Sequence, residues 1–521
     1  MRQLLLTSLL ATCLSGGLSA QLGHSGVCGT PPVDMDVLEA SKAMAKTLEL
    51  GGKMTTYVPL RFKLAGRDDG TGAASPHRVL DLVRSMNVDF APVGWQFFLE
   101  NPDGEPWDYI FDTDFYNDHS ASQQRLRDES TREAVTIFVP NTATPANSSG
   151  NGVTLGYYSP SLDVLVFKRS EVGSNASTAS HEVGHFFSLP HTFRGWDCCS
   201  WSGTTTDGCN NPEITSPVTT LVAPCSNSAA VELVTRGAGA NCSAAGDRFC
   251  DTNADYNFGF GWPNCDYDGG VRDRNGDLLT PDEDNFMGYF LDCNPYQFSD
   301  EQKAAMQGNL ALGSRSRLRG GSPDVLDTIS GPLVYTFPVE EEYTSDFDAV
   351  ELDWEPVPNA QYYYVEVSER RSFSSLFYSE IITDGRTELT LTDVDADERY
   401  FYRIRPFSQI SFGALQPTRT FFTGTLSSTS APAAAVNDLV LSPNPVASGS
   451  ALGVTVTSDV AFNVTARVLD LTGRTVLEQT AYVGSGETRF ELGVDRALPR
   501  GTYVLSLTSD RGVSNRKFSV Q

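Results

Sequence analysis

The stretch Ser180-His-Glu-Val-Gly-His-Phe-Phe-Ser-Leu-Pro-His191 decides how the chain is organised. If it is helical, His181 and His185 lie four residues apart on one face, as two ligands of one metal ion must. His191 follows six residues after His185, too far along to join them from the same helix. Pro190 disfavours helical geometry in the residue before it. We therefore expect the helix to end there and the chain to turn back toward the same ion.

Three imidazoles leave one position of a tetrahedral zinc open for water, which is typical of a catalytic site rather than a closed structural one. Glu182 directly follows the first histidine, on the side where the zinc-bound water would stand, and is expected to serve as the general base. The competing interpretation is an ordinary amphipathic helix that carries histidines by chance. Three of the chain's six histidines fall at ligand spacing within residues 181–191, which favours zinc.

Composition and charge narrow the classes of function. At 521 residues the chain is expected to form roughly three domains, and 40% hydrophobic with 20% charged residues is ordinary for globular protein. The net charge of -27 argues against nucleic acid or anionic membrane surfaces as partners. It favours solubility and binding of divalent cations.

The first 20 residues predict a secretory signal peptide, with an apolar run from Leu4 to Leu14 that is too short to span a membrane. Cys13 lies close to a lipoprotein processing motif, but the Thr before it fits poorly, so lipidation is the minor alternative. No other stretch is long enough for a transmembrane helix. Export agrees with the cysteine content, because disulfides persist outside the cytoplasm.

Residues 21–50 are interpreted as a pro-segment, with a helix that starts after Asp34, and residues 51–320 as the catalytic domain. Hydrophobic periodicity in that domain predicts helices over 76–86 and 298–312, and strands over 55–64, 95–99, 134–139, 152–158 and 164–168. The order predicts an α+β domain, a mixed sheet backed by helices.

Residues 194–265 have seven cysteines, many small polar residues and little periodicity, so a long loop region tied by disulfides is expected. Its aspartates supply hard oxygen ligands among glycines, which makes calcium a candidate. Solvated acidic loops are the alternative, since the spacing does not match an EF-hand.

Two small all-β sandwich domains are expected after the catalytic domain. Residues 325–425 alternate as strands do, with an early Trp354 and a late Tyr402, and resemble a fibronectin type III domain. Residues 426–436 are a Ser, Thr, Ala and Pro linker. Residues 437–521 resemble the C-terminal sorting domain of the bacterial type IX secretion system. That resemblance implies that the secretion machinery is a partner, that the protein is secreted or held at the cell surface, and that this domain is removed.

Several separated motifs occur in a fixed order: His-Glu-Val-Gly-His with His191-Thr-Phe193, Gly246-Asp247 with Asp251-Thr252, Asn285-Phe-Met287-Gly-Tyr289, and Cys293 before Phe298-Ser-Asp-Glu-Gln302. Together they resemble the pappalysin, or cytophagalysin, family of metallopeptidases in the metzincin clan, over roughly residues 50–312. The resemblance implies a metzincin-like catalytic domain with Met287 in a tight turn beneath the ligands.

The same resemblance assigns roles to further residues. It implies that Tyr289 lies near the metal, where its hydroxyl would stabilise the oxyanion, and that Gly152–Tyr158 is the edge strand that pairs with substrate. It implies structural calcium near Asp247, Asp251 and Thr252. The family has Gly where this chain has Ser188, because the backbone there turns left-handed, at a cost on the order of 1 kcal/mol for Ser.

Cysteine parity singles out Cys28. Loss of Cys13 with the signal peptide leaves nine cysteines, of which eight can pair within the catalytic domain, with Cys265 to Cys293 expected among the pairs. Cys28 remains in the pro-segment, in a Cys-Gly-Thr setting that resembles the family's. Its thiolate could fill the open zinc position and keep a zymogen silent. An unpaired or intermolecular cysteine is the open alternative.

We therefore expect a secreted zinc metalloendopeptidase that hydrolyses peptide bonds in protein or peptide substrates, with Zn²⁺ as catalytic and Ca²⁺ as structural cofactor. The alternative is a catalytically inactive, peptidase-like adhesin or binding protein. The presence of Glu182 argues against it, because inactive relatives usually lose the general base.

Overall fold

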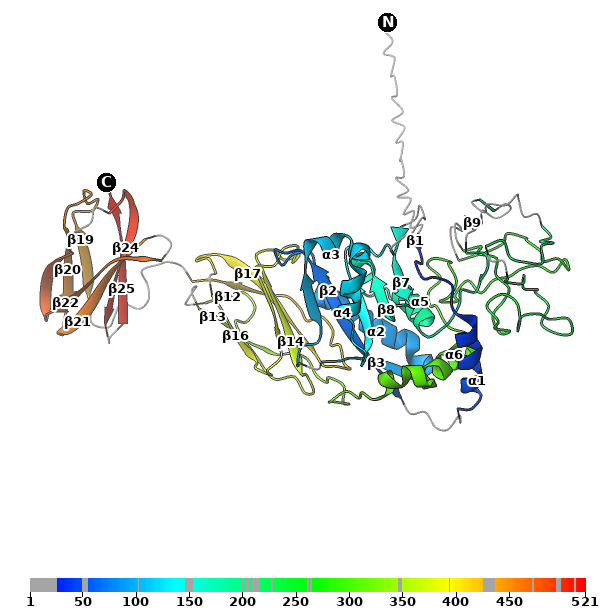
Figure 1. The fold of residues 1–521 in the computed structure, drawn as a ribbon. Coiled ribbons are helices and arrows are strands. Elements are labelled where there is room, and N and C mark those ends of the chain that lie inside the picture. The colour runs from blue at the N-terminus through cyan, green and yellow to red at the C-terminus, as the bar shows by residue number, and fades with distance from the viewer. Residues whose placement is uncertain are drawn as a thin grey trace, which may run out of the picture.

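The computed structural model describes residues 26–48, 55–101, 103–145, 153–197, 200–201, 206–207, 216–225, 228–259, 262, 265–344, 349–392, 394–424, 436–470, 473–492, 498–509 and 512–521. The expected signal peptide, most of the expected linker, and Cys198, Cys199 and Cys209 lie outside the described residues. Figure 1 shows a central body with a sheet and helices, a loop-rich region beside it, and two β modules.

A six-stranded mixed sheet forms the centre of that body, in the order β3-β2-β5-β8-β7, with β4 also paired to β2. Its pairs are parallel except for the edge strand β7, which runs antiparallel to β8. Every residue of β5 and β8 is buried, as expected for strands covered on both faces. The strands are β2 (Thr56–Gly66), β3 (Trp95–Leu99), β4 (Asp108–Phe111), β5 (Val135–Val139), β7 (Gly156–Ser159) and β8 (Val164–Phe167).

Helices pack around this sheet, and their termini follow local sequence signals. Asp34 accepts a hydrogen bond from the Asp36 N–H and caps the first helix, while Ser299 and Gln302 form a capping box on the last. The helices are α1 (Met35–Ala45), α2 (Pro76–Phe90), α3 (Thr113–Asn117), α4 (Gln123–Asp128), α5 (Ser177–Phe186) and α6 (Asp300–Ala311). The mixed sheet backed by helices is therefore present.

The stretch expected as a single strand over 152–158 is divided. Its described part forms β6 (Val153–Thr154) and β7, with Leu155 between them. β6 leaves the central sheet and pairs in parallel with β1 (Gly26–Val27), in the N-terminal segment. The expectation of one continuous strand was wrong, because the N-terminal segment takes up the first half.

The region after α5 is loop-rich, as expected. Its described strands are only β9 (Ser200–Trp201) and β10 (Thr206–Asp207). Disulfides join Cys242 to Cys250 and Cys265 to Cys293, the second being the expected pair. Cys225 is also disulfide-bonded. A separate aromatic core, in which Trp196 stacks on Tyr256 at 4.5 Å between ring centroids, supports these loops.

The first β module, residues 335–422, consists of two sheets around one core that includes Trp354 and Tyr402. One sheet has the order β11-β13-β16 and the other β12-β18-β17-β14-β15. We call it the first sandwich. Its strands are β11 (Tyr335–Phe337), β12 (Glu342–Tyr343), β13 (Val350–Trp354), β14 (Tyr362–Ser368), β15 (Tyr378–Ile382), β16 (Glu388–Leu391), β17 (Arg399–Phe407) and β18 (Arg419–Phe422).

The second sandwich, coloured orange to red in Figure 1, combines sheets β19-β20-β23 and β22-β21-β24-β25. Its strands are β19 (Asp438–Ser442), β20 (Leu452–Ser458), β21 (Phe462–Leu469), β22 (Thr475–Val483), β23 (Gly486–Leu492), β24 (Gly501–Ser509) and β25 (Gly512–Val520). Across the described part of the chain, no helix is long and apolar enough to cross a membrane.

Candidate metal centre

Helix α5 ends where the sequence predicts, and the chain turns back at once. Phe186 is its last residue, Ser188 adopts a φ of 69°, and the Leu189 N–H donates to the Gly184 carbonyl at 2.9 Å. This is the left-handed turn that closes many helices, usually with Gly. The Ser188 hydroxyl lies 3.0 Å from the Asn309 amide nitrogen and 3.2 Å from the Ser41 hydroxyl, and these buried hydrogen bonds offset the strain.

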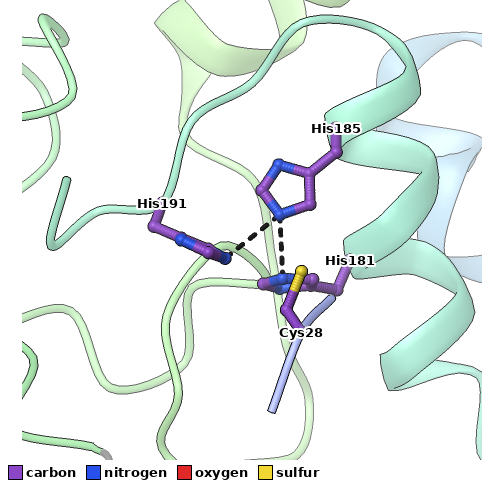
Figure 2. A group of neighbouring side chains, drawn as sticks. All are labelled: Cys28, His181, His185 and His191. Carbon is purple, nitrogen blue, oxygen red and sulfur yellow. Dashed lines mark hydrogen bonds between the residues drawn. The ribbon is translucent and has the colours of Figure 1, made fainter. Parts of the chain in front are cut away.

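The three histidines converge on one point (Figure 2). The Nε2 atom of His185 lies 3.1 Å from Nε2 of His181 and 3.1 Å from Nε2 of His191. The sulfur of Cys28 lies with them, and the four ligand atoms are within 4.8 Å of one another. Nitrogens bound about 2.0–2.1 Å from a tetrahedral zinc are roughly 3.3 Å apart, so the donor set fits that ion.

The outer nitrogen of each ring fixes its tautomer. Nδ1 donates to the Phe286 carbonyl at 2.6 Å in His181 and to the Leu189 carbonyl at 2.7 Å in His185. Burial lowers the pKa of His181 to about 3 and holds that of His185 well below its usual value, which keeps both rings neutral. Their inner lone pairs therefore face one another, an arrangement that a cation stabilises.

Asp197 orients the third ring, and the sequence analysis missed it. Nδ1 of His191 donates to Oδ1 of Asp197 at 2.6 Å, and Oδ2 accepts from the Gly195 N–H at 2.9 Å. Burial raises the pKa of Asp197, but the hydrogen bond and charge attraction from His191 outweigh it and the net shift is downward. The one available signal was an acid six residues after an expected ligand histidine, and such an acid is common by chance.

Glu182 and Tyr289 lie beside this cluster. Glu182 is buried, its Oε2 accepts a hydrogen bond from Thr30 Oγ1 at 2.6 Å, and burial raises its pKa to about 7. The Tyr289 hydroxyl accepts from the Cys28 N–H at 3.0 Å, and its ring centroid is 5.1 Å from that of His191. The structure thus brings together the three expected ligands, the expected base, the expected tyrosine and Cys28.

Met287 lies directly under α5. It is fully buried, and a side chain at Gly184 would place its Cβ 2.5 Å from the Met287 sulfur, so only Gly fits there. The Met287 carbonyl accepts from the Thr192 N–H at 3.2 Å, next to His191. The turn therefore supports the helix and the returning chain together.

The residues expected to bind calcium separate into two places. Asp251 accepts from Ser299 Oγ at 2.8 Å and from the Glu301 N–H at 2.7 Å, so it caps α6. Asp247 is buried and accepts from Thr252 Oγ1 at 3.0 Å. Burial, followed by the charge of Asp247, raises the pKa of Glu232 to about 9. The sequence analysis did not single out Glu232.

A pocket of about 90 Å³ opens against the metal centre. His181, Glu182 and Tyr289 are among its lining residues. The remaining lining residues include the apolar side chains of Leu155, Phe286, Phe290, Leu291 and Tyr296.

Comparison with known families identifies the C-terminal module. Residues 441–521 match the family described as "Secretion system C-terminal sorting domain". The protein is therefore exported by the type IX system and is secreted or held at the cell surface. No curated protein matches the chain.

Solved structures with some similarity include fibronectin modules. The chicken CNTN1 FN1-FN3 domains match at 12% identity and a TM-score of 0.17, over 39% of this chain and 69% of that one. The fibronectin(III)-like modules of Clostridium thermocellum CbhA match at 12% identity and a TM-score of 0.16, over 36% and 93%. The fn3 domain of human contactin 1 matches at 15% identity and a TM-score of 0.17, over 22% and 93%.

Proposed function

We propose that the protein is a secreted, zinc-dependent endopeptidase of the pappalysin type. The observation that carries the proposal is the convergence of three imidazole Nε2 atoms, 3.1 Å apart in two pairs, with a buried carboxylate on the same helix turn. His181, His185 and His191 would hold the ion and leave a fourth position open.

The chain's own groups suit peptide hydrolysis. A zinc ion on three imidazoles lowers the pKa of the water it binds toward about 7 and polarises a substrate carbonyl. Glu182 accepts a proton from the attacking water and transfers it to the leaving amine as the C–N bond breaks and a C–O bond forms. The Tyr289 hydroxyl donates to the carbonyl oxygen as negative charge builds there.

A substrate would lie in extended form along β6 and β7. The N-terminal segment already shows the pairing that is available, since the Gly29 N–H donates to the Gly156 carbonyl at 3.0 Å. Thr30 Oγ1 accepts from the Tyr158 N–H at 2.7 Å. A peptide that replaces this segment would use the same backbone groups.

Glu182→Ala tests the function directly. Proteolysis of casein should fall by at least about 10²-fold, the contribution typical of a general base, while zinc content stays near one ion because the imidazoles are unchanged. A chelator should abolish wild-type activity and added zinc should restore it. Activity retained in the variant, or a wild type that binds no zinc, would refute the proposal.

Cys28 is proposed to keep the precursor latent. It is the free cysteine among the described residues, and its sulfur lies where the fourth ligand of the ion would be. Removal of the N-terminal segment would then free both the metal and Glu182. Cys28→Ala in the uncleaved precursor should raise its activity at once, whereas a precursor as inactive as the wild type would show that latency does not depend on this thiol.

A second cation, calcium, is proposed at Asp247 and Glu232 rather than at Asp251. Both carboxylates are buried, and Oε2 of Glu232 has no hydrogen-bond partner within the described part of the chain. Gly246 lets Glu232 lie against the backbone next to Asp247, because a Cβ there would lie 2.1 Å from that oxygen. Calcium titration monitored by thermal melting should stabilise the wild type and leave Glu232→Gln unchanged. A wild type that calcium does not stabilise would exclude the site.

A further inference from the structure

A buried arginine joins the edge strand β7 to the end of helix α5. Arg315 lies in the 3-10 helix Gly313–Arg319, which follows α6, and only 9% of it is exposed. Its Nη1 donates to both carboxylate oxygens of Asp163, at 2.6 and 2.7 Å. Its Nη2 donates to the Phe186 carbonyl at 2.7 Å and to the Tyr158 hydroxyl at 3.3 Å. One guanidinium therefore connects a strand, the turn that follows it and a helix.

Both ends of this connection belong to parts that the proposed reaction uses. Phe186 is the last residue of α5 and directly follows His185. Its carbonyl is one of those at a helix end that have no partner inside the helix, where a cation is favourable. Tyr158 lies in β7, along which a substrate would bind, and its hydroxyl donates to Asp163 at 2.9 Å. Arg315 thus fixes the separation of the edge strand and the histidine-bearing helix.

Arg315 also reaches the turn that follows α5. Its Nε donates to Asn309 Oδ1 at 3.3 Å, and Nδ2 of Asn309 donates to Ser188 Oγ at 3.0 Å. The next residue is Leu189, whose carbonyl accepts from Nδ1 of His185 at 2.7 Å. Through Asn309, the same guanidinium therefore supports the turn that orients His185.

The chemistry of this contact favours a role in geometry over one in net stability. Burial would raise the pKa of Asp163, but the charges of Arg315 and Arg317 and the hydrogen bonds that the carboxylate accepts outweigh it, and the net shift is downward. The pair is therefore ionised. A buried ion pair often adds no net stability compared with apolar residues of the same volume. It does fix orientation, because a planar guanidinium directs its donors along set directions.

We propose that Arg315 is a positioning residue, which holds β7 and α5 in the relative position that places a bound peptide carbonyl against the attacking water. This rests on the proposed peptidase function. Arg315 acts through Phe186 and Tyr158, and the outer nitrogens of the three imidazoles have acceptors of their own. Its loss should therefore slow the chemical step and leave the zinc bound. A displacement of about 1 Å between reacting groups can cost about 10²-fold in rate.

The test compares kcat, KM and zinc content of the secreted, active protein and its variants on one peptide, well below the melting temperature of each. Arg315→Gln removes the connection. The matched control is Arg317→Gln, because Arg317 also pairs with Asp163 and, across the residues that the structure describes, donates no hydrogen bond to α5. Tyr158→Phe removes one hydroxyl at the strand end of the connection and keeps the ring against Phe186.

We expect kcat of Arg315→Gln to fall at least about tenfold, with KM within about twofold of the wild type and about one zinc ion per chain. The control should keep the wild-type kcat even if it melts earlier. If Arg315→Gln does not fold, Tyr158→Phe decides, with an expected loss in kcat of about threefold or more.

Three results would overturn the inference and leave the peptidase function intact. They are a wild-type kcat in folded, zinc-loaded Arg315→Gln, an equal loss of kcat in Arg317→Gln, and, where only Tyr158→Phe folds, a wild-type kcat in that variant. Each would mean that Arg315 only stabilises the fold. Absence of any cleavage by the zinc-loaded wild type would instead refute the proposed function itself.

Discussion

The two sandwiches have similar two-sheet cores but relate differently to the rest of the chain. The core of the second draws only on residues 436–520. The first contributes Tyr362, Tyr364, Phe407 and Phe412 to the same hydrophobic cluster as the strands and helices of the central body. Phe407 stacks on Trp107 with ring centroids 5.9 Å apart.

The ion pairs of the two sandwiches differ in the same way. Arg405 of the first sandwich has a fully buried side chain, which donates to the His77 carbonyl at 3.0 Å and to Asp81 at 2.7 Å. In the second sandwich, Arg467 pairs with Glu478 at 2.7 Å while both side chains stay about half exposed. The first sandwich is therefore packed into the body that contains the central sheet, whereas the second has a core of its own.

Truncation should separate the two modules most clearly. A chain that ends at Ser430 lacks the sorting domain and should keep full activity and catalytic-domain stability, but it should not reach the cell surface in its native host. A chain that ends at Gly320 should aggregate, because Trp107 and the rest of the shared core become exposed. Solubility, thermal melting and casein hydrolysis decide the comparison. A soluble, active chain ending at Gly320 would show that the first sandwich is dispensable.

Metal removal should produce the next largest effect, and in one region only. If zinc binds at His181, His185 and His191, and its free concentration is 1,000 times its Kd, binding stabilises the folded state by about 4 kcal/mol. A chelator should therefore lower the melting temperature of the catalytic body and leave the transition of the second sandwich unchanged. Calorimetry of the full chain resolves both transitions, and equal shifts in both, or none, would contradict the proposed ion.

The sequence predicted the features that depend on local spacing. The histidine-bearing helix and its end before Pro190 follow from residues that are neighbours in the chain, whereas the left-handed Ser188 was expected from the family resemblance. The central strands followed from periodicity, and Trp354 and Tyr402 did enter one sandwich core.

Features that depend on distant residues were missed. Thr30 on Glu182, and Arg405 on Asp81, join positions 152 and 324 residues apart, and neither has a motif. The division of the predicted 152–158 strand has the same cause, because β1 is supplied from the N-terminal segment. Asp251 was a calcium candidate through the family resemblance of the Gly246-Asp247 and Asp251-Thr252 motif, and its contact with the start of α6, which is distant in sequence, was not foreseen.

Substitution of one arginine in each sandwich should show the same difference with a smaller loss of stability than truncation causes. Arg405→Ala leaves a cavity and removes the donor for the His77 and Gly413 carbonyls, so it should destabilise the central body by about 3 kcal/mol. Arg467→Ala removes an exposed pair and should cost less than about 1 kcal/mol. Denaturant unfolding of the two variants measures both values. Similar costs for the two would mean that the Arg405 contacts do not hold the first sandwich in place.

Low pH should slightly weaken the contact between α2 and the first sandwich. Nε2 of His77 lies 2.8 Å from Glu366, and burial lowers the pKa of His77 despite that carboxylate. Because the folded protein binds this proton less readily than the unfolded chain, the contribution of His77 to stability is complete above about pH 6.5 and declines as the pH falls below it.

His77→Gln isolates this contribution, since it keeps a donor for Glu366 and does not titrate. Between about pH 7.5 and about pH 5.5, the wild type should lose roughly 1 kcal/mol more stability than the variant, while protonation of the metal ligands affects both equally. Residues 437–521 contain no histidine, so the transition of the second sandwich should be nearly flat over this range. If the wild type and His77→Gln show the same pH dependence, the interface does not sense acid through His77, and the difference between the two sandwiches lies in packing and the Arg405 contacts alone.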